Sequence, residues 1–164
     1  MKKTVMITQT ALFSALICVM TAFIGHIPVG VNGGYIHFGD ALIFLCAAIL
    51  PKPWSVAAAA IGGGLADLLT APSWIIATVL IKSALTVAFK NTGRILCLRN
   101  IAAAVAAVVI STAGYFIAEW IMFGSLAASL AGIPANIVQS VGSAVIFFAI
   151  GFIFDRFDLK KHLK

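Results

Sequence analysis

The sequence predicts an all-α integral membrane protein, a single bundle of six transmembrane helices over residues 1–164. Hydrophobic residues make up 62% of the chain and charged residues only 10%, and the mean hydropathy is +1.12, values far from those of a water-soluble domain. A transmembrane helix needs roughly 20 apolar residues, so six of them with short loops would use nearly the whole chain. The basic residues lie singly or in pairs at the ends of apolar runs, a pattern that indicates membrane topology rather than binding to nucleic acid.

Breaks in hydrophobicity divide the chain into these six segments. The breaks are rich in proline, glycine or charge and lie at 28–34, 51–53, 71–73, 90–100 and 124–134. The first apolar run follows two lysines, as in a signal peptide, but lacks a convincing small-residue cleavage site, so we expect a retained helix. The expected spans are 5–25, 37–50, 54–70, 73–89, 101–123 and 134–154.

The basic residues predict the orientation of the bundle. With both termini in the cytoplasm, ten of the eleven Lys and Arg residues fall inside and the outer loops carry none, which is the asymmetry that the positive-inside rule describes. The exception is Lys82, within the fourth span. The ten inner residues are Lys2, Lys3, Lys52, Lys90, Arg94, Arg99, Arg156, Lys160, Lys161 and Lys164.

Four ionisable residues lie inside the expected spans, namely Asp40, Asp67, Lys82 and Glu119. Each costs at least about 2.5 kcal/mol in hydrocarbon, so each needs a partner or a function. Asp40 and Asp67 lie near the outer surface and Glu119 about one turn below it, while Lys82 is near the middle of its span. Two interpretations of Lys82 stay open: a structural ion pair with Asp67, or contact with a ligand.

Polar residues three or four apart share a helix face, and two such stripes begin at the outer ends of their spans. The fifth span carries Ser111, Tyr115 and Glu119; the sixth carries Asn136, Gln139, Ser140 and Ser143. Together with the loop at 29–40 they predict an outward-facing site for a small solute. The candidate binding residues are Asn32, Gly34, Tyr35, His37, Asp40, Asp67, Trp74, Lys82, Tyr115, Glu119, Asn136 and Gln139.

Simpler interpretations exist for several of these residues. Tyr35 and Trp74 could be aromatic anchors at the membrane interface, and Asn136 and Gln139 could bond neighbouring helices. His37 lies three residues before Asp40, but two such residues without further ligands do not predict a metal site.

The first span has a stripe of small side chains at Ala11, Ala15, Cys18 and Ala22. Small residues at this spacing let another helix approach closely. That helix could belong to a partner subunit or to this chain.

Four segments in order resemble the substrate-binding S components of energy-coupling factor (ECF) vitamin transporters. Residues 11–15, Ala-Leu-Phe-Ser-Ala, match the family's AxxxA pattern, and residues 33–40 are similar to its first loop running into a short second helix. Residues 62–69 resemble the end of the third helix, and residues 133–139 the start of the sixth. The resemblance covers nearly the whole chain.

The resemblance implies a division of labour. The AxxxA face of such a subunit docks on a transmembrane coupling subunit that is linked to two cytoplasmic ATPases, and the S component topples to deliver its vitamin. We therefore expect no catalysis and no cofactor in this chain, with ATP used by the partners. The absence of a G-x-x-x-x-G-K-[ST] phosphate loop from the sequence fits that expectation. The implied location is the plasma membrane of a prokaryote.

The loop at 33–40 looks most like that of members handling hydroxymethylpyrimidine or pyridoxine, with riboflavin as the alternative. Two other functions are compatible with the sequence. A stand-alone secondary transporter or channel could use Asp67, Lys82 and Glu119 as an ion relay, although an almost wholly apolar inner half argues against a continuous pore. An intramembrane enzyme could use His37 with Asp40 or Glu119, but no nucleophile motif supports it.

Overall fold

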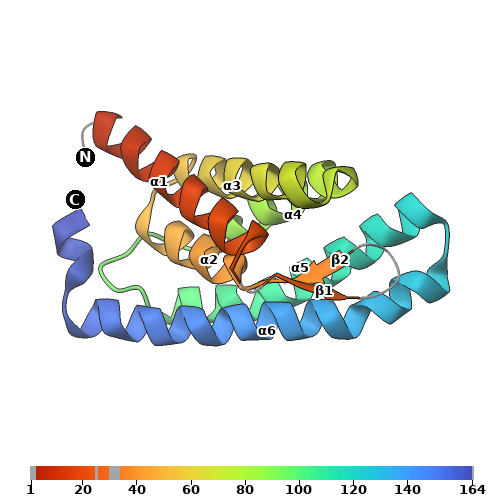
Figure 1. Cartoon of the computed structure of the whole chain (residues 1–164). Coiled ribbons are helices and arrows are strands. Elements are labelled where there is room, and N and C mark those ends of the chain that lie inside the picture. Colours follow the sequence, from red (N-terminus) through yellow and green to blue (C-terminus); the bar gives the residue numbers. More distant parts are fainter. Residues whose placement is uncertain (1–2, 25, 30–33, 164) are drawn as a thin grey trace.

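The computed structural model describes residues 3–24, 26–29 and 34–163, with the side chains of residues 29, 34, 35, 162 and 163 left aside. Helices dominate the chain, and one small hairpin follows the first helix (Figure 1). The elements in order are α1 (Lys3–Ala22), β1 (Ile27–Val29), β2 (Gly34–Ile36), α2 (Gly39–Ile49), α3 (Trp54–Thr70), η1 (Pro72–Trp74), α4 (Ile75–Val87), α5 (Leu98–Phe123), α6 (Leu126–Arg156) and η2 (Leu159–Leu163).

The all-helical membrane class predicted from the sequence is confirmed. Helices α1, α5 and α6 have 20, 26 and 31 residues and are long and apolar enough to cross a membrane. The other apolar helices, α2, α3 and the stretch Pro72–Val87, are shorter. The helix predicted at 54–70 matches α3 in both bounds. The count of six spans remains a prediction.

The predicted break at 124–134 is wrong, because α6 already begins at Leu126. Gly124 ends α5 with a left-handed backbone (φ 64°), and the Ala128 N–H donates to the Ser125 hydroxyl at 3.2 Å, which caps the new helix. Pro134 lies inside α6, where it removes one backbone hydrogen bond, a loss that membrane helices tolerate. The connection between α5 and α6 is therefore a tight turn.

The loop after the first helix contains structure that the sequence patterns did not predict. Strands β1 and β2 pair antiparallel, with Ile27 opposite Ile36 and Val29 opposite Gly34. Strand β2 contacts α6. In Figure 1 the hairpin continues beyond the start of α2, beside α5 and α6.

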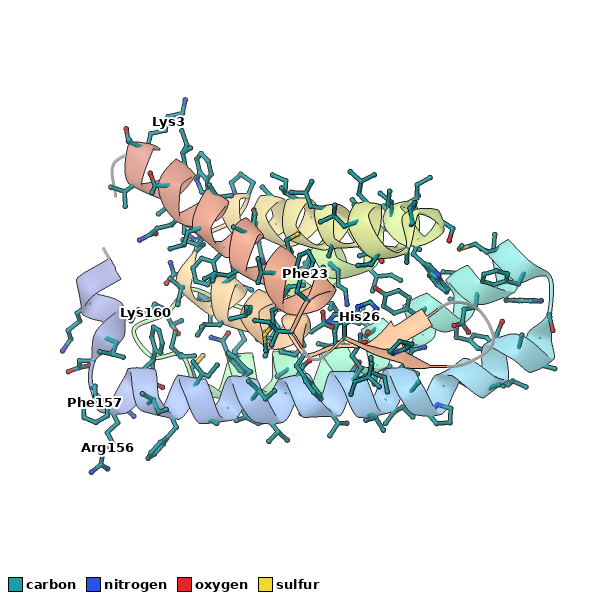
Figure 2. The ribbon with its side chains drawn as sticks, in the orientation of Figure 1. Lys3, Phe23, His26, Arg156, Phe157 and Lys160 are labelled. Carbon is teal, nitrogen blue, oxygen red and sulfur yellow. The ribbon has the colours of Figure 1, made fainter. Side chains whose placement is uncertain are left out.

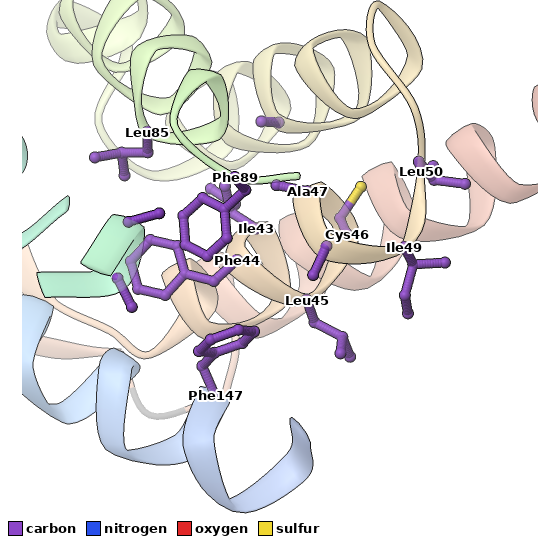
Figure 3. Packing of buried hydrophobic residues seen from close by; sticks show 14 of the residues in the cluster. Ile43, Phe44, Leu45, Cys46, Ala47, Ile49, Leu50, Leu85, Phe89 and Phe147 are labelled. Atoms are coloured by element: carbon purple, nitrogen blue, oxygen red, sulfur yellow. The ribbon is translucent and has the colours of Figure 1, made fainter. Parts of the chain in front are cut away.

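Helix α2 forms the centre of the bundle. Ten of its 11 residues are buried, and it contacts α1, α3, α4 and α6. The Phe44 ring stacks on Phe89 at a centroid distance of 5.3 Å and meets Phe147 edge-on at 6.0 Å (Figure 3). These aromatic contacts fix the position of α2 between α4 and α6.

Small residues bring α1 and α3 into close contact. A Cβ atom added at Gly62 would lie only 2.7 Å from the carbonyl oxygen of Ser14, so only glycine fits there. The Ser14 hydroxyl also reaches the Ala58 carbonyl, at 3.4 Å. The face of α1 that packs on α3 is therefore not the face of Ala11 and Ala15.

Both chain termini lie at the same end of the bundle (Figure 1), as the predicted topology requires. Lys3, Arg156 and Lys160 are found at this end, which we call the terminal end (Figure 2). The buried Lys160 ammonium donates to the carbonyl of Ala48 at 2.6 Å, in the last turn of α2, and to that of Thr92. It thereby satisfies a carbonyl that the end of α2 leaves exposed and ties it to the loop between α4 and α5.

Candidate binding site

A buried ion pair joins α2 to α4. The Lys82 ammonium lies 2.6 Å from the Asp40 carboxylate, and the two side chains are 1% and 0% exposed. Asp40 is in the first turn of α2, where the helix dipole also favours a negative charge. The sequence left open whether Lys82 pairs with Asp67 or contacts a ligand; in the structure α2 lies against α4, and Asp40 is the acidic partner of Lys82.

Aromatic rings cover the lysine. The Lys82 ammonium lies 5.1 Å from the centre of the Tyr115 ring, and the Tyr115 and Thr78 hydroxyl oxygens are 3.1 Å apart. The Trp74 ring lies 5.9 Å from that of Tyr115 and 6.0 Å from that of Phe123. Trp74 is buried inside the protein, so it is not an exposed interfacial anchor.

The sequence patterns did not identify Thr78 as a candidate binding residue. It lies four residues before Lys82 on the same face of α4, so helical spacing around Lys82 could have identified it.

His37 and Gln139 connect the hairpin to α6. The His37 backbone N–H donates to the Gln139 side-chain oxygen at 3.2 Å, and the Gly39 N–H donates to His37 Nδ1 at 3.0 Å. The sequence suggested that Gln139 could bond a neighbouring helix. In the structure it bonds the segment that leads into α2. Within the described part of the chain, no three His, Cys, Asp or Glu side chains converge as metal ligands would.

The other predicted binding residues differ in their burial and in how far the structure describes them. Asp67 is buried near the end of α3, and Asn136 is half-buried on α6. Gly34 and Tyr35 form part of β2, but the side chain of Tyr35 is not described. Asn32 lies outside the described residues.

Most residues of the polar stripes of α5 and α6 are buried, whereas Tyr115 and Asn136 are half-buried. Ser111, Ser140 and Ser143 are at most 1% exposed, and Glu119 is 7% exposed. Their oxygens Ser111 Oγ, Ser140 Oγ, Ser143 Oγ and Glu119 Oε2 have no hydrogen-bond partner among the described residues. Buried polar atoms are seldom left in this state, so groups that complete them are expected from outside the chain.

The small-residue stripe of α1 divides into two parts. Ala11 and Ala15 are exposed, Cys18 is half-buried and Ala22 is buried. The exposed alanines lie on the side away from α3 and leave a smooth helix face that a second protein could approach.

Comparison with known proteins identifies the family. Residues 1–154 match the model of the ECF-type riboflavin transporter S component. A Pyrococcus woesei protein described as an uncharacterized protein in a gap 3' region is 27% identical over 139 residues, which cover 84% of this chain and 93% of that protein. Because the family match covers nearly the whole chain, the protein belongs to the S-component family of ECF-type riboflavin transporters.

Proposed function

We propose that this chain captures a small water-soluble vitamin, or a vitamin precursor, from outside the cell for an ATP-driven importer. S components are substrate-binding transporter subunits and not enzymes, so binding is the activity to explain. The observation that carries the proposal is the buried Asp40–Lys82 pair with the Tyr115 ring against it, together with unpartnered buried hydroxyls on α5 and α6. The proposed outside is the end away from the chain termini.

The geometry supports a flat, polar ligand. Trp74 and Tyr115 offer aromatic surfaces, while Ser111, Ser140 and Ser143 offer hydroxyl groups that can both donate and accept hydrogen bonds. Such a mixture suits a small heteroaromatic solute. Hydroxymethylpyrimidine and pyridoxine are the favoured ligands, and riboflavin, which the family description names, is the alternative.

The ligand-binding set includes the residues identified from the sequence. We propose that Asp40, Lys82, Tyr115 and Trp74 form its centre and that the hairpin residues cover it. The full set is Asn32, Gly34, Tyr35, His37, Asp40, Asp67, Trp74, Lys82, Tyr115, Glu119, Asn136 and Gln139.

The direct test is binding to the purified protein. The detergent-solubilised chain should bind one vitamin molecule per chain in the absence of ATP, as titration calorimetry can measure with hydroxymethylpyrimidine, pyridoxine and riboflavin in turn. Absence of binding to all three would contradict the proposal. Uptake into proteoliposomes driven by an ion gradient, without any coupling subunit, would instead support a stand-alone transporter.

Docking on a coupling subunit is the second half of the proposal. Ala11 and Ala15 are exposed on α1, and we propose that they, with Cys18 and Ala22, contact a transmembrane coupling subunit linked to two cytoplasmic ATPases. Both chain termini would then lie in the cytoplasm. The chain itself would need no cofactor.

A bulky substitution tests this docking face. Ala15→Trp should abolish vitamin uptake in cells while binding to the purified variant stays within about twofold of wild type, because the tryptophan blocks helix contact outside the ligand site. Val109→Trp is the matched control, since Val109 is 67% exposed on α5, away from that face. Equal uptake by the Ala15→Trp and Val109→Trp variants would show that the face is wrongly chosen.

A further inference from the structure

Glu119 is a buried acidic residue that forms no ion pair with any described residue. Its side chain is 7% exposed, and its Oε2 atom has no hydrogen-bond partner within the described residues. It lies four residues after Tyr115 on α5, so the two side chains share a face and start about 5–6 Å apart. Glu119 therefore lies one turn beyond the aromatic cover of Lys82.

A glycine on the facing helix makes room for this carboxylate. A Cβ atom added at Gly132 of α6 would lie 2.5 Å from Glu119 Oε2 and 2.9 Å from Oε1. Any larger residue at 132 would displace the carboxylate or push the two helices apart. The contact holds Glu119 between α5 and α6 rather than on the lipid-facing surface.

The distribution of charge explains why Glu119 lacks a cation. Residues 4–51, 53–89 and 100–155 contain a single lysine or arginine, Lys82. Its ammonium is already held by Asp40 at 2.6 Å and by the ring of Tyr115. The region around Glu119 therefore has an acidic group with no lysine or arginine available to balance it.

An uncompensated carboxylate in such a place costs several kcal/mol, and a cation brought by a ligand would recover that cost. We infer that Glu119 determines the charge of the substrate by binding an ammonium group outside the ring of the solute, while that ring lies against Tyr115 and Trp74. This inference rests on the proposed function. It adds a requirement for positive charge that the aromatic surfaces and the serine hydroxyls do not impose.

A matched ligand pair tests the charge requirement. Pyridoxamine carries an ammonium group where pyridoxine carries a hydroxyl, and the two are otherwise alike. Titration calorimetry of the purified wild type at pH 7 should give at least tenfold tighter binding of pyridoxamine. Glu119→Gln, which keeps the shape and removes the charge, should weaken pyridoxamine binding at least tenfold and pyridoxine binding less than threefold.

Two further variants control for structure. Glu119→Asp keeps the charge and should retain the preference for pyridoxamine, and Trp120→Phe, at a neighbouring position that is 51% exposed, should leave both affinities within twofold of wild type. Thermal unfolding of each variant identifies any that fail to fold. A wild type without this preference overturns the inference whatever the variants show, and the Glu119→Gln variant assigns the preference to Glu119.

The outcomes separate this inference from the proposed function. A wild type that binds pyridoxine or riboflavin as tightly as pyridoxamine, or a Glu119→Gln variant that keeps the pyridoxamine affinity, overturns the inference and leaves the proposed function standing. A wild type that binds none of pyridoxamine, pyridoxine, hydroxymethylpyrimidine and riboflavin overturns both.

Discussion

The two ends of this bundle differ in how many of their polar groups are bonded within the chain, although the buried Ser55 hydroxyl at the start of α3 also has no partner in the described structure. At the terminal end, the Asp155 carboxylate accepts from the N–H groups of Ile95 and Leu96 at 2.7 and 2.8 Å, and Lys160 donates to two carbonyls. Toward the other end, Ser140, Ser143 and Glu119 keep buried oxygens without a partner in the described structure. A satisfied network stabilises a fold by itself, whereas an incomplete one indicates a place where a ligand supplies the missing groups.

Helix α2 connects these two regions. Its first turn carries Asp40, which pairs with Lys82, and its last turn carries the Ala48 carbonyl, which accepts from Lys160. The two lysines therefore hold the helix at both ends, and substitutions at each can show which contacts are structural.

The largest effect is expected at the buried ion pair. Lys82→Met leaves the Asp40 carboxylate buried without its cation and should destabilise the protein by about 3–5 kcal/mol. Unfolding of the detergent-solubilised protein by heat or denaturant measures the loss. The double variant Asp40→Asn/Lys82→Met should recover much of it, because no charge is then stranded, and equal losses in the single and double variants would contradict the pairing.

An intermediate effect is expected at the terminal end. Lys160→Met removes a charged donor from the carbonyls of Ala48 and Thr92 and should cost about 1.5–3 kcal/mol in the same assay. Lys161→Met is the control: its side chain is 72% exposed and pairs only with Asp158 on the surface, so about 0.5 kcal/mol or less is expected. Ligand affinity should stay unchanged in both variants. A large loss of affinity in Lys160→Met would contradict the view that the terminal end has a structural role and the opposite end binds the ligand.

The smallest effect on stability is expected at the unpartnered hydroxyls. Ser140→Ala removes a buried hydroxyl that bonds to nothing in the described structure, so the free energy of unfolding should change by less than about 0.5 kcal/mol. Affinity for the bound vitamin should nevertheless fall. Ser129→Ala serves for comparison, because that hydroxyl donates to the Ser125 carbonyl at 3.0 Å. Loss of stability without loss of affinity at Ser140 would refute a ligand role.

Much of the fold could be predicted from the sequence, because composition and apolar run length depend on local residues alone. The bounds of α3 follow from Pro53 before the helix and Pro72 after it. Pro134 predicts the wrong start for α6. Proline usually marks a break in a helix, but neighbouring helices allow it inside a membrane helix. The hairpin was missed because strands of three residues are too short to show alternation.

The candidate site was predicted less completely, for a different reason. Helical spacing identified the stripes through Ser111 and Gln139, since a stripe depends on one helix only. The partner of Lys82 depends on which helices are neighbours, and one sequence does not contain that information. Asp67 is closer to Lys82 along the chain, but Asp40 meets it in space.

The shortness of α2 determines how a captured solute would leave. Eleven residues span about 16 Å, roughly half of the hydrocarbon thickness, so a molecule beside Asp40 would have a complete helix between it and the terminal end. That helix is surrounded by four others and packed through Phe44, so sliding it aside would break the hydrophobic core. Rotation of the whole subunit, the movement that the family resemblance implies, would preserve these contacts.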